Sequence, residues 1–263
     1  MPDAPIRFKF GKHPPRHDPR TLQLKNYLGA DLPAPPATEK NWMVKIPDKR
    51  WGMMGNDNYG DCTCAAAGHM IMEWTAHTQP KPVVVPDAAI LQFYENFSGA
   101  GLDSGANLLD VLKYWRKTGL EEHQILAFVA IALKNPDQLK TAVSIFANCY
   151  IGIALPHFAA YPPAGKDITE IPWVVPAGGP VGKAAPNPNE GHCVAAVGYD
   201  EQNVYVVTWG QIKPMSWEFY TAYADEAFAV LSKDWLARNK APNGFALAVL
   251  EKDLSHIKAH PRT

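Results

Sequence analysis

Long apolar runs are missing from this chain of 263 residues. The longest, residues 125–133, has nine residues, about half of the ~20 that a membrane-spanning helix needs. The first ten residues, MPDAPIRFKF, also lack the apolar stretch of a secretory leader. We therefore expect no membrane partner, and a protein that is cytoplasmic or released by a non-classical route.

The chain also has almost no net charge, because 25 Lys and Arg residues are balanced by 26 Asp and Glu residues. This balance argues against a nucleic-acid partner, which would require a basic surface. The charges are unevenly spread, however. Residues 1–50 hold 10 basic and 5 acidic residues and 9 of the 24 prolines, whereas the rest of the chain holds 15 basic and 21 acidic residues.

Proline interrupts helices, so the N-terminal composition predicts extended chain. We expect residues 1–41 to form a basic, proline-rich strap on an acidic body, with a main domain over residues 42–255 and a tail over residues 256–263. A disordered basic tail is the alternative. The apolar side chains in this region, such as Phe8 and Phe10, favour the strap.

Cysteine is limited to four residues, and nothing in the sequence predicts export, so we expect reduced thiols rather than disulfides. The Cys62-x-Cys64 spacing, even with His69 or His192 added, does not match a structural zinc site, and no second cysteine pair follows. We therefore expect neither a metal nor an organic cofactor.

Hydrophobic periodicity changes along the chain. Helical spacing of apolar residues predicts helices over 62–77, 87–97, 105–118 and 136–148. Within the proline-rich N-terminal region, only residues 21–28 could form a short helix. Short β-branched or apolar runs then predict strands over 150–155, 193–199, 204–209, 227–231 and 245–250. Helices first and strands second indicate an α+β fold, with a helical half over about 56–148 and a β half over about 149–250.

Cys62 stands where the first of these helices begins, with Asp61 before it as a plausible N-cap. A helix N-terminus favours a thiolate over a thiol because of its partial positive charge and free N–H groups. A thiolate also needs a proton partner with a pKa near neutrality, which is usually a histidine. His192, on a predicted strand about 130 residues downstream, is the candidate.

These two segments resemble those of papain-like (C1-type) cysteine peptidases. The stretch NDNYGDCTCAA at 56–66 is similar to the nucleophile motif of bacterial members, GHCVAAVGYD at 191–200 to the histidine strand, and VTWG at 207–210 to the motif N-S-W-G. The resemblance, in order and spacing, covers about residues 42–250. It implies a helical left half, an antiparallel β-sheet or barrel as the right half, a cleft between them, a peptide or protein substrate, and a bacterial or phage protein with an atypical active site.

The resemblance also implies roles for individual residues. Cys62 is expected to be the nucleophile and His192 the general base and then the acid. Asn56, where the family normally has a glutamine, is expected to donate to the oxyanion, with Asn58 as the runner-up. Trp209 is expected to shield the histidine from water, and Gly105 to pair its backbone with an extended peptide.

One departure from the family pattern concerns the residue that orients the histidine ring. The family's asparagine aligns with Val207, which cannot form a hydrogen bond. Thr208 is the tentative substitute, although it faces the other side if the strand is regular. Asp225 or Glu226 could instead supply a carboxylate, although the sequence does not place them.

Two functions from different classes therefore stand beside each other. The first is a thiol hydrolase that cleaves amide or peptide bonds through an acyl-thioester on Cys62, with transglutaminase-like or deamidating chemistry on the same dyad as a variant. The second is a catalytically impaired papain-fold binding or structural protein, such as a phage-associated or accessory component. An inhibitory pro-segment is a further possibility if residues 1–50 cross the cleft. The simpler interpretation of Cys64, His69 and Cys193 is that they are core residues.

Overall fold

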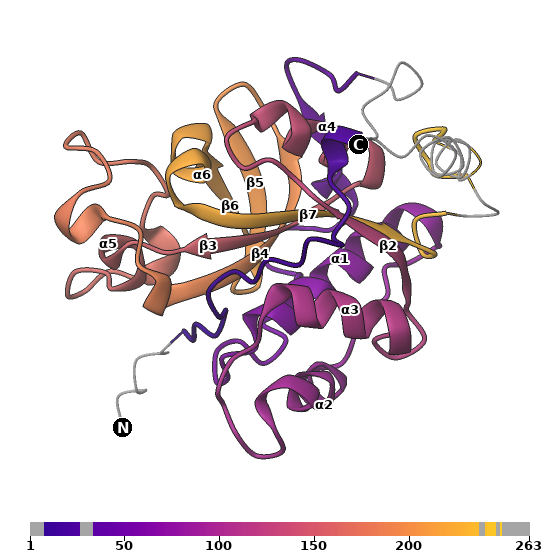
Figure 1. Cartoon of the computed structure of the whole chain (residues 1–263), viewed down its shortest axis with the longest axis horizontal. Coiled ribbons are helices and arrows are strands. Elements are labelled where there is room, and N and C mark those ends of the chain that lie inside the picture. The colour runs from indigo at the N-terminus through magenta and orange to yellow at the C-terminus, as the bar shows by residue number, and fades with distance from the viewer. Residues whose placement is uncertain (1–7, 27–33, 237–239, 246–247, 249–263) are drawn as a thin grey trace.

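The computed structural model describes residues 8–26, 34–236, 240–245 and 248 (Figure 1). Its helices are α1 (Cys62–Thr78), α2 (Asp87–Ser98), α3 (Leu108–Thr118), α4 (Pro136–Phe146), α5 (His157–Ala160) and α6 (Trp217–Tyr223). Its strands are β1 (Lys40–Asn41), β2 (Ile125–Ala130), β3 (Cys149–Ala154), β4 (Gly191–Tyr199), β5 (Asn203–Thr208), β6 (Gln211–Ser216) and β7 (Ala224–Ser232). The α+β class predicted from the sequence is confirmed.

The strands form one antiparallel sheet in the order β2-β7-β3-β4-β5-β6, and β1 pairs with the end of β4. Within the described residues the path does not close on itself, so the sheet is open rather than a barrel. The central strands β3 and β4 are buried along their whole length. They therefore give side chains on β4 a rigid support.

Helix α1 is the core of the helical half. Fifteen of its 17 residues are buried, as expected of a helix that is apolar on all sides. It contacts β4 on the sheet side and α2 and α3 on the other, so it joins the helical half to the sheet (Figure 1). A residue at the start of α1 and a residue on β4 are thus held on facing elements.

Several elements differ from the sequence-based expectations. Strand β2 lies inside the segment assigned to the helical half but pairs with β7. Strand β6 was not expected, because its sequence QIKPMS contains a proline and a lysine. Where a short helix was expected over 21–28, the structure has a single 3-10 turn at Leu24–Asn26, and residues 27–28 lie outside the described chain. Of the strand predicted over 245–250, only residues 245 and 248 are described, and neither is in a strand.

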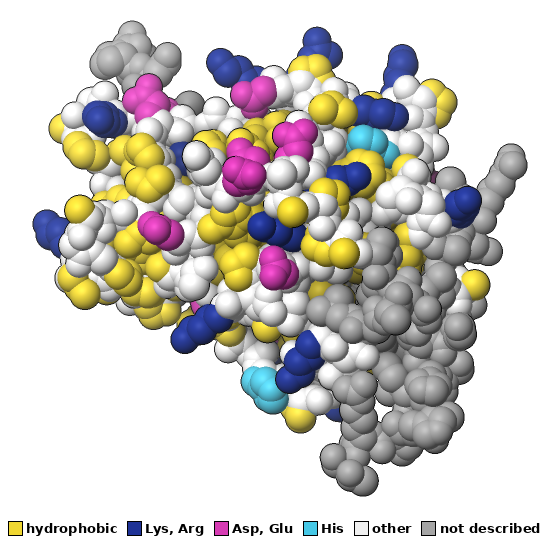
Figure 2. Space-filling view, turned by 90° about the horizontal axis from the view of Figure 1, so that it is seen from above, with side chains coloured by type: hydrophobic (Ala, Val, Ile, Leu, Met, Phe, Trp, Pro, Cys, Tyr) yellow, Lys and Arg dark blue, Asp and Glu magenta, His cyan; other side chains and the backbone are white. Residues whose placement is uncertain are grey.

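The surface carries no broad field of one charge on the face shown in Figure 2, where Lys, Arg, Asp and Glu side chains are interspersed with apolar ones among the coloured residues. None of the described helices is long and apolar enough to cross a membrane.

Candidate active site

Cys62 is the first residue of α1, and local hydrogen bonds fix its position. The backbone N–H groups of Cys64 and Ala65 donate to the Asp61 carbonyl oxygen, at 2.7 and 2.9 Å. The Tyr150 hydroxyl on β3 donates to the Thr63 carbonyl oxygen at 2.6 Å, which ties the first turn of α1 to the sheet. The N-terminus of α1, where the helix dipole favours a thiolate, is therefore anchored from both sides.

Asp61 occupies the N-cap position, but its side chain forms no capping hydrogen bond, so the cap predicted from sequence is right in position only. The carboxyl group is fully buried, and neither of its oxygens has a hydrogen-bond partner among the described residues. Burial raises the pKa of this carboxyl group to about 8, and the nearby Asn56 side chain lowers it only in part. Asp61 is therefore held as a neutral acid beside the thiol at pH 7.

His192 lies on β4, opposite Ile153 of β3. Its Nε2 atom is 2.6 Å from Thr208 Oγ1, and its Nδ1 atom has no hydrogen-bond partner among the described residues. The Trp209 ring stacks on the imidazole with a centroid distance of 4.6 Å and an interplanar angle of 20°. The imidazole is therefore held at one nitrogen and on one face.

Strand register explains why Thr208, and not Val207, reaches the histidine. Val207 pairs with Ala195, so continuing this register places Thr208 opposite Val194. Side chains alternate between the two faces of a strand, so Thr208 shares a face with Val194 and His192, while Val207 points to the opposite face. The expectation that Thr208 would face away from the histidine is therefore wrong.

An N-terminal stretch, residues 8–13, lies between the helical half and the sheet; we call it the cleft segment (Figure 1). On the helical side, the Ala106 N–H donates to the Gly11 carbonyl at 2.7 Å and the His13 N–H donates to the Ala106 carbonyl at 2.9 Å. On the sheet side, the N–H groups of Gly11 and Lys12 both donate to the Gly191 carbonyl, at 3.2 and 3.0 Å. The segment is thus bound by its backbone from both walls.

The cleft segment covers Cys62 and His192. Phe10 places its ring edge-on to His192, with a centroid distance of 5.8 Å, and Cys62 and His192 are each only 1% exposed. Burial raises the pKa of the Cys62 thiol to about 12, although the backbone of Cys193 and of Gly11 partly opposes this. Burial lowers the pKa of His192 to about 3. With the segment in place, both groups are therefore neutral.

Asn56 and Gly105, two other expected site residues, lie beside the cleft segment. Asn56 is buried, and its Nδ2 atom donates to the carbonyl oxygens of Tyr59 at 3.1 Å and of Lys9 at 3.4 Å. Asn58, the runner-up, is exposed. Gly105 supplies room rather than hydrogen bonds to the segment, because a Cβ there would lie 2.3 Å from the Gly11 carbonyl oxygen.

The remaining candidates have structural environments. Asp225 and Glu226 face Lys12 and not the histidine. His69 is buried and bonds the Gly52 carbonyl through Nε2 at 3.0 Å. All four cysteines are buried free thiols. Across the described part of the chain, no group of three His, Cys, Asp or Glu residues could hold a metal ion.

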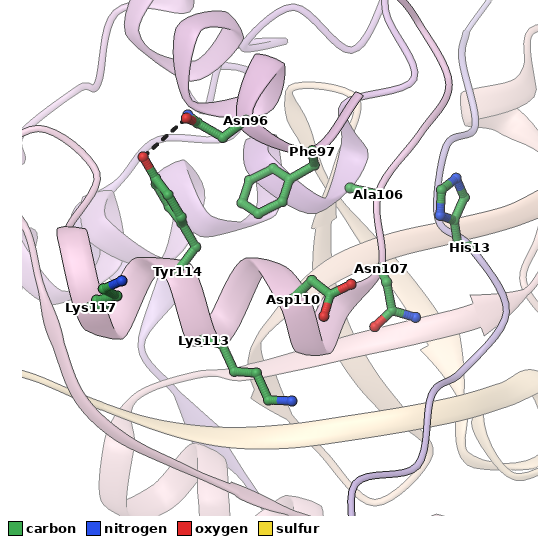
Figure 3. A pocket seen from close by; sticks show the side chains of 9 residues that line it. All are labelled: His13, Asn96, Phe97, Ala106, Asn107, Asp110, Lys113, Tyr114 and Lys117. Atoms are coloured by element: carbon green, nitrogen blue, oxygen red, sulfur yellow. Dashed lines mark hydrogen bonds between the residues drawn. The ribbon is translucent and has the colours of Figure 1, made fainter. Parts of the chain in front are cut away.

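Beside the cleft segment, the helical half has a hollow of about 460 Å³. Figure 3 shows His13 at one side of it and Asp110 and Lys113 of α3 at another, with Tyr114 of α3 bonded to Asn96 of α2. Neither Cys62 nor His192 lines the hollow, which adjoins the cleft segment through His13.

Sequence reasoning missed three residues of this site. Lys12 and Ala106 were not singled out, because neither carries a chemical motif and both act through tertiary pairing. Trp173 lies edge-on to His192 and Trp209, with centroid distances of 6.4 and 6.1 Å. It comes from the long segment between β3 and β4, residues 155–190, which holds eight prolines. The unusual length of that segment was the only available signal.

Comparison with known proteins shows similarity in structure only. No family model matches the chain, and no curated protein matches it. Among solved structures, it is similar to xylellain, a cysteine protease from Xylella fastidiosa, with a TM-score of 0.62 and 16% identity over 88% of this chain and 98% of that one. It is also similar to the digestive procathepsin L2 of Tenebrio molitor, with a TM-score of 0.58 and 12% identity over 88% of this chain and 80% of that one. A third match is the cysteine protease and lectin-like region of Cwp84 from Clostridium difficile, with a TM-score of 0.54 and 12% identity over 86% and 56% of the two chains.

Proposed function

Because the chain has the papain-like α+β fold expected from its sequence, we propose that it is a thiol hydrolase that cleaves peptide or related amide bonds. The observation that carries the proposal is the state of His192. Its Nε2 atom is held by Thr208, and its Nδ1 atom is left without a partner in the described structure. Nδ1 is therefore the nitrogen available to take the proton of Cys62.

The reaction that this arrangement supports begins with proton transfer from the Cys62 thiol to His192. The sulfur attacks the substrate carbonyl carbon, and the oxyanion accepts hydrogen bonds from the Asn56 amide and the Cys62 backbone N–H. His192 then gives its proton to the leaving amine as the C–N bond breaks, which leaves an acyl-thioester. Water, deprotonated by His192, adds to the thioester carbonyl, and the Cys62 sulfur leaves with a proton to regenerate the thiol.

Thr208 is proposed as a positioning residue and Trp209 as a cover. If Thr208 Oγ1 accepts a hydrogen bond from Nε2–H, the lone pair of Nδ1 is free to act as the base. Trp209 stacks on the ring and excludes water from that face. No metal or organic cofactor enters this scheme.

The cleft segment is proposed to hold this enzyme in a latent form. It occupies both walls with the same kind of backbone hydrogen bonds that an extended peptide would make. It also leaves the thiol and the imidazole buried and neutral. A peptide substrate must therefore displace residues 8–13.

Covalent labelling tests the proposal in a full-length chain whose cleft segment is dislodged by Gly11→Val, since a Cβ at Gly11 would lie 1.7 Å from the Gly60 carbonyl oxygen. An epoxide or vinyl-sulfone peptide probe should label this chain. Labelling should be lost with Cys62→Ala and retained with Cys64→Ala, which is the matched buried thiol. Absence of labelling, or equal labelling of both variants, would favour the catalytically impaired binding protein instead.

A further inference from the structure

Lys12 is a lysine whose side chain is only 1% exposed. Its ammonium group lies 2.8 Å from Asp225 Oδ2 and 3.5 Å from Glu226 Oε1, and it donates to the His13 carbonyl oxygen at 3.0 Å. A buried ammonium is costly unless it is paired. This environment, which we call the Lys12 pocket, is therefore built for a cation.

Glycines shape the Lys12 pocket. A Cβ at Gly152, in the middle of β3, would lie 2.2 Å from Lys12 Cε, and a Cβ at Gly191 would lie 2.0 Å from the Lys12 carbonyl oxygen. Glycine weakens a strand interior, and its presence there marks the close approach of another backbone or ligand. The pocket thus admits a long, unbranched side chain from a backbone that runs against β4.

The pocket offers more carboxyl oxygens than Lys12 pairs with. Glu226 is 7% exposed, and neither of its carboxylate oxygens has a hydrogen-bond partner among the described residues; the same holds for Asp225 Oδ1. Two carboxylates face one ammonium, so acceptors remain for a group with more donors. A guanidinium has five donors in a planar fork and would satisfy more of them than an ammonium does.

The pocket is not sealed around Lys12. A hollow of about 560 Å³ beneath residues 15–23 is lined in part by Asp225 and Glu226. It provides the space that a side chain wider than lysine requires.

We propose, resting on the hydrolase function above, that Asp225 and Glu226 form the specificity pocket of the cleft and select peptides with a lysine or arginine side chain. Lys12 occupies that pocket as an internal stand-in. The backbone of a substrate residue that pairs with Ala106 and Gly191, as Lys12 now does, places its side chain between the two carboxylates. Lys12 fills the pocket while the cleft segment is bound, and the basic side chain of a substrate fills it after the segment is released.

The turnover test uses the full-length Gly11→Val chain and a positional-scanning library of peptidyl-coumarin amides. At one position before the cleaved bond, lysine and arginine should exceed leucine and glutamate by at least about tenfold in kcat/KM, the effect of one buried charge pair. Glu226→Gln in the same chain should reduce that ratio at least severalfold while the leucine substrate changes less. Glu201→Gln, which removes an exposed carboxylate from the β4–β5 turn, is the control and should leave the ratio unchanged.

A binding test separates this proposal from the hydrolase function. The Gly11→Val chain carrying Cys62→Ala is titrated calorimetrically with the peptide FKFGKH, which spans residues 8–13, and with FKFGLH, in which leucine replaces only the lysine that corresponds to Lys12. The peptide FKFGKH should bind at least about tenfold more tightly, and Glu226→Gln should remove the difference. If Gly11→Val does not fold, Lys12→Ala, which empties the pocket without a steric overlap, replaces it in both tests.

The outcomes are distinguishable. Turnover without preference for a basic residue, together with equal binding of the two peptides, overturns the specificity pocket and leaves the hydrolase standing. Selective, Glu226-dependent binding without turnover supports the pocket and counts against the hydrolase. Equal binding without turnover overturns both.

Discussion

The Nε2 atom of His192 lies 2.6 Å from the hydroxyl oxygen of Thr208, where the resemblance to papain-like peptidases leads one to expect an asparagine amide. A carboxamide oxygen can only accept from a ring N–H, whereas a hydroxyl can accept or donate. As an acceptor, Thr208 stabilises the tautomer with the proton on Nε2 and the imidazolium that forms during reaction. As a donor, it would stabilise the unreactive tautomer, which makes the site sensitive to this single hydroxyl.

Removal of that hydroxyl should slow the reaction. We expect Thr208→Val, in the chain with the cleft segment displaced, to lower kcat/KM for a peptide substrate by about 10²-fold, the low end of what general acid–base catalysis contributes. The pKa of His192 that the pH–rate profile reports should also fall, because the imidazolium loses its hydrogen-bond acceptor. The unfolding free energy should fall by no more than about 1–3 kcal/mol, the cost of leaving a buried nitrogen without a hydrogen-bond partner.

The neighbouring position offers the matched control. Val207→Thr combined with Thr208→Val moves the hydroxyl by one residue, to the other face of β5. We expect no recovery of rate in this double variant. Recovery, or a pH profile that Thr208→Val leaves unchanged, would contradict the positioning role of Thr208.

Displacement of the cleft segment should expose the thiol and restore its reactivity. Burial holds the pKa of Cys62 at about 12 and that of His192 at about 3. In the natural chain we expect slow alkylation by iodoacetamide from pH 5 to 9. In Gly11→Val the rate at pH 7 should rise about tenfold or more, with a midpoint below the ~8.5 of free cysteine.

The control for this measurement is Gly178→Val, because a Cβ at that glycine meets nothing within 4 Å. Its alkylation rate should equal that of the natural chain. If Gly11→Val alkylates no faster than Gly178→Val, residues 8–13 do not restrict access to Cys62.

Asp61 should make the fold less stable as the pH rises. Its folded pKa of about 8 lies above the unfolded value near 3.8, so its contribution is fully present below about pH 3.8 and is lost as the pH rises through 8. The unfolding free energy of Asp61→Asn minus that of the natural chain should therefore be larger at pH 8 than at pH 4. We expect an increase of at least about 1 kcal/mol, since one pKa unit corresponds to about 1.4 kcal/mol.

Denaturant unfolding of the two chains at both pH values measures this gain. Glu201→Gln, at an exposed turn, provides the reference for a carboxylate without burial. A difference between Asp61→Asn and the natural chain that stays constant from pH 4 to pH 8 would argue against a protonated Asp61.

A second pH effect comes from His123, whose Nδ1 lies 2.9 Å from Asp234 Oδ1 and joins the turn before β2 to the end of β7. The hydrogen bond to Asp234 raises the pKa of His123. The contribution of this pair is therefore fully present below the unfolded value of about 6.5 and is lost as the pH rises through the folded pKa.

We expect Asp234→Asn to destabilise the protein more at pH 5.5 than at pH 8.5, as measured by thermal or denaturant unfolding. His17→Gln, which changes an exposed histidine of the N-terminal region, should show no such difference. An equal loss at both pH values would indicate that the ion pair contributes nothing beyond its neutral hydrogen bond.

The sequence by itself determined the α+β class and the two halves of the fold. Helical spacing in α1 to α4 and short β-branched runs in β3, β4 and β5 are local signals, and they were sufficient there. They failed for β6, because its lysine and proline are tolerated at the edge of a sheet but do not form a typical strand pattern. They also failed for β2, whose apolar run is stabilised as a strand by pairing with β7. The sequence also identified Cys62 and His192 as candidates, because a thiol at a helix start and a histidine at a strand start follow from local patterns.

Only the tertiary structure decided what surrounds those two residues. Strand register places Thr208 rather than Val207 at the histidine, and register depends on partners that are distant in sequence. Hydrogen bonds with the Ala106 backbone and to the Gly191 carbonyl hold the cleft segment between the two halves, and the contact of Lys12 with Asp225 joins positions 213 residues apart. The uneven charge of residues 1–50 and the rest of the chain predicted a basic strap on an acidic body. Coulomb attraction acts between any opposite charges that come close, so only the placed backbone decides which carboxylates Lys12 meets.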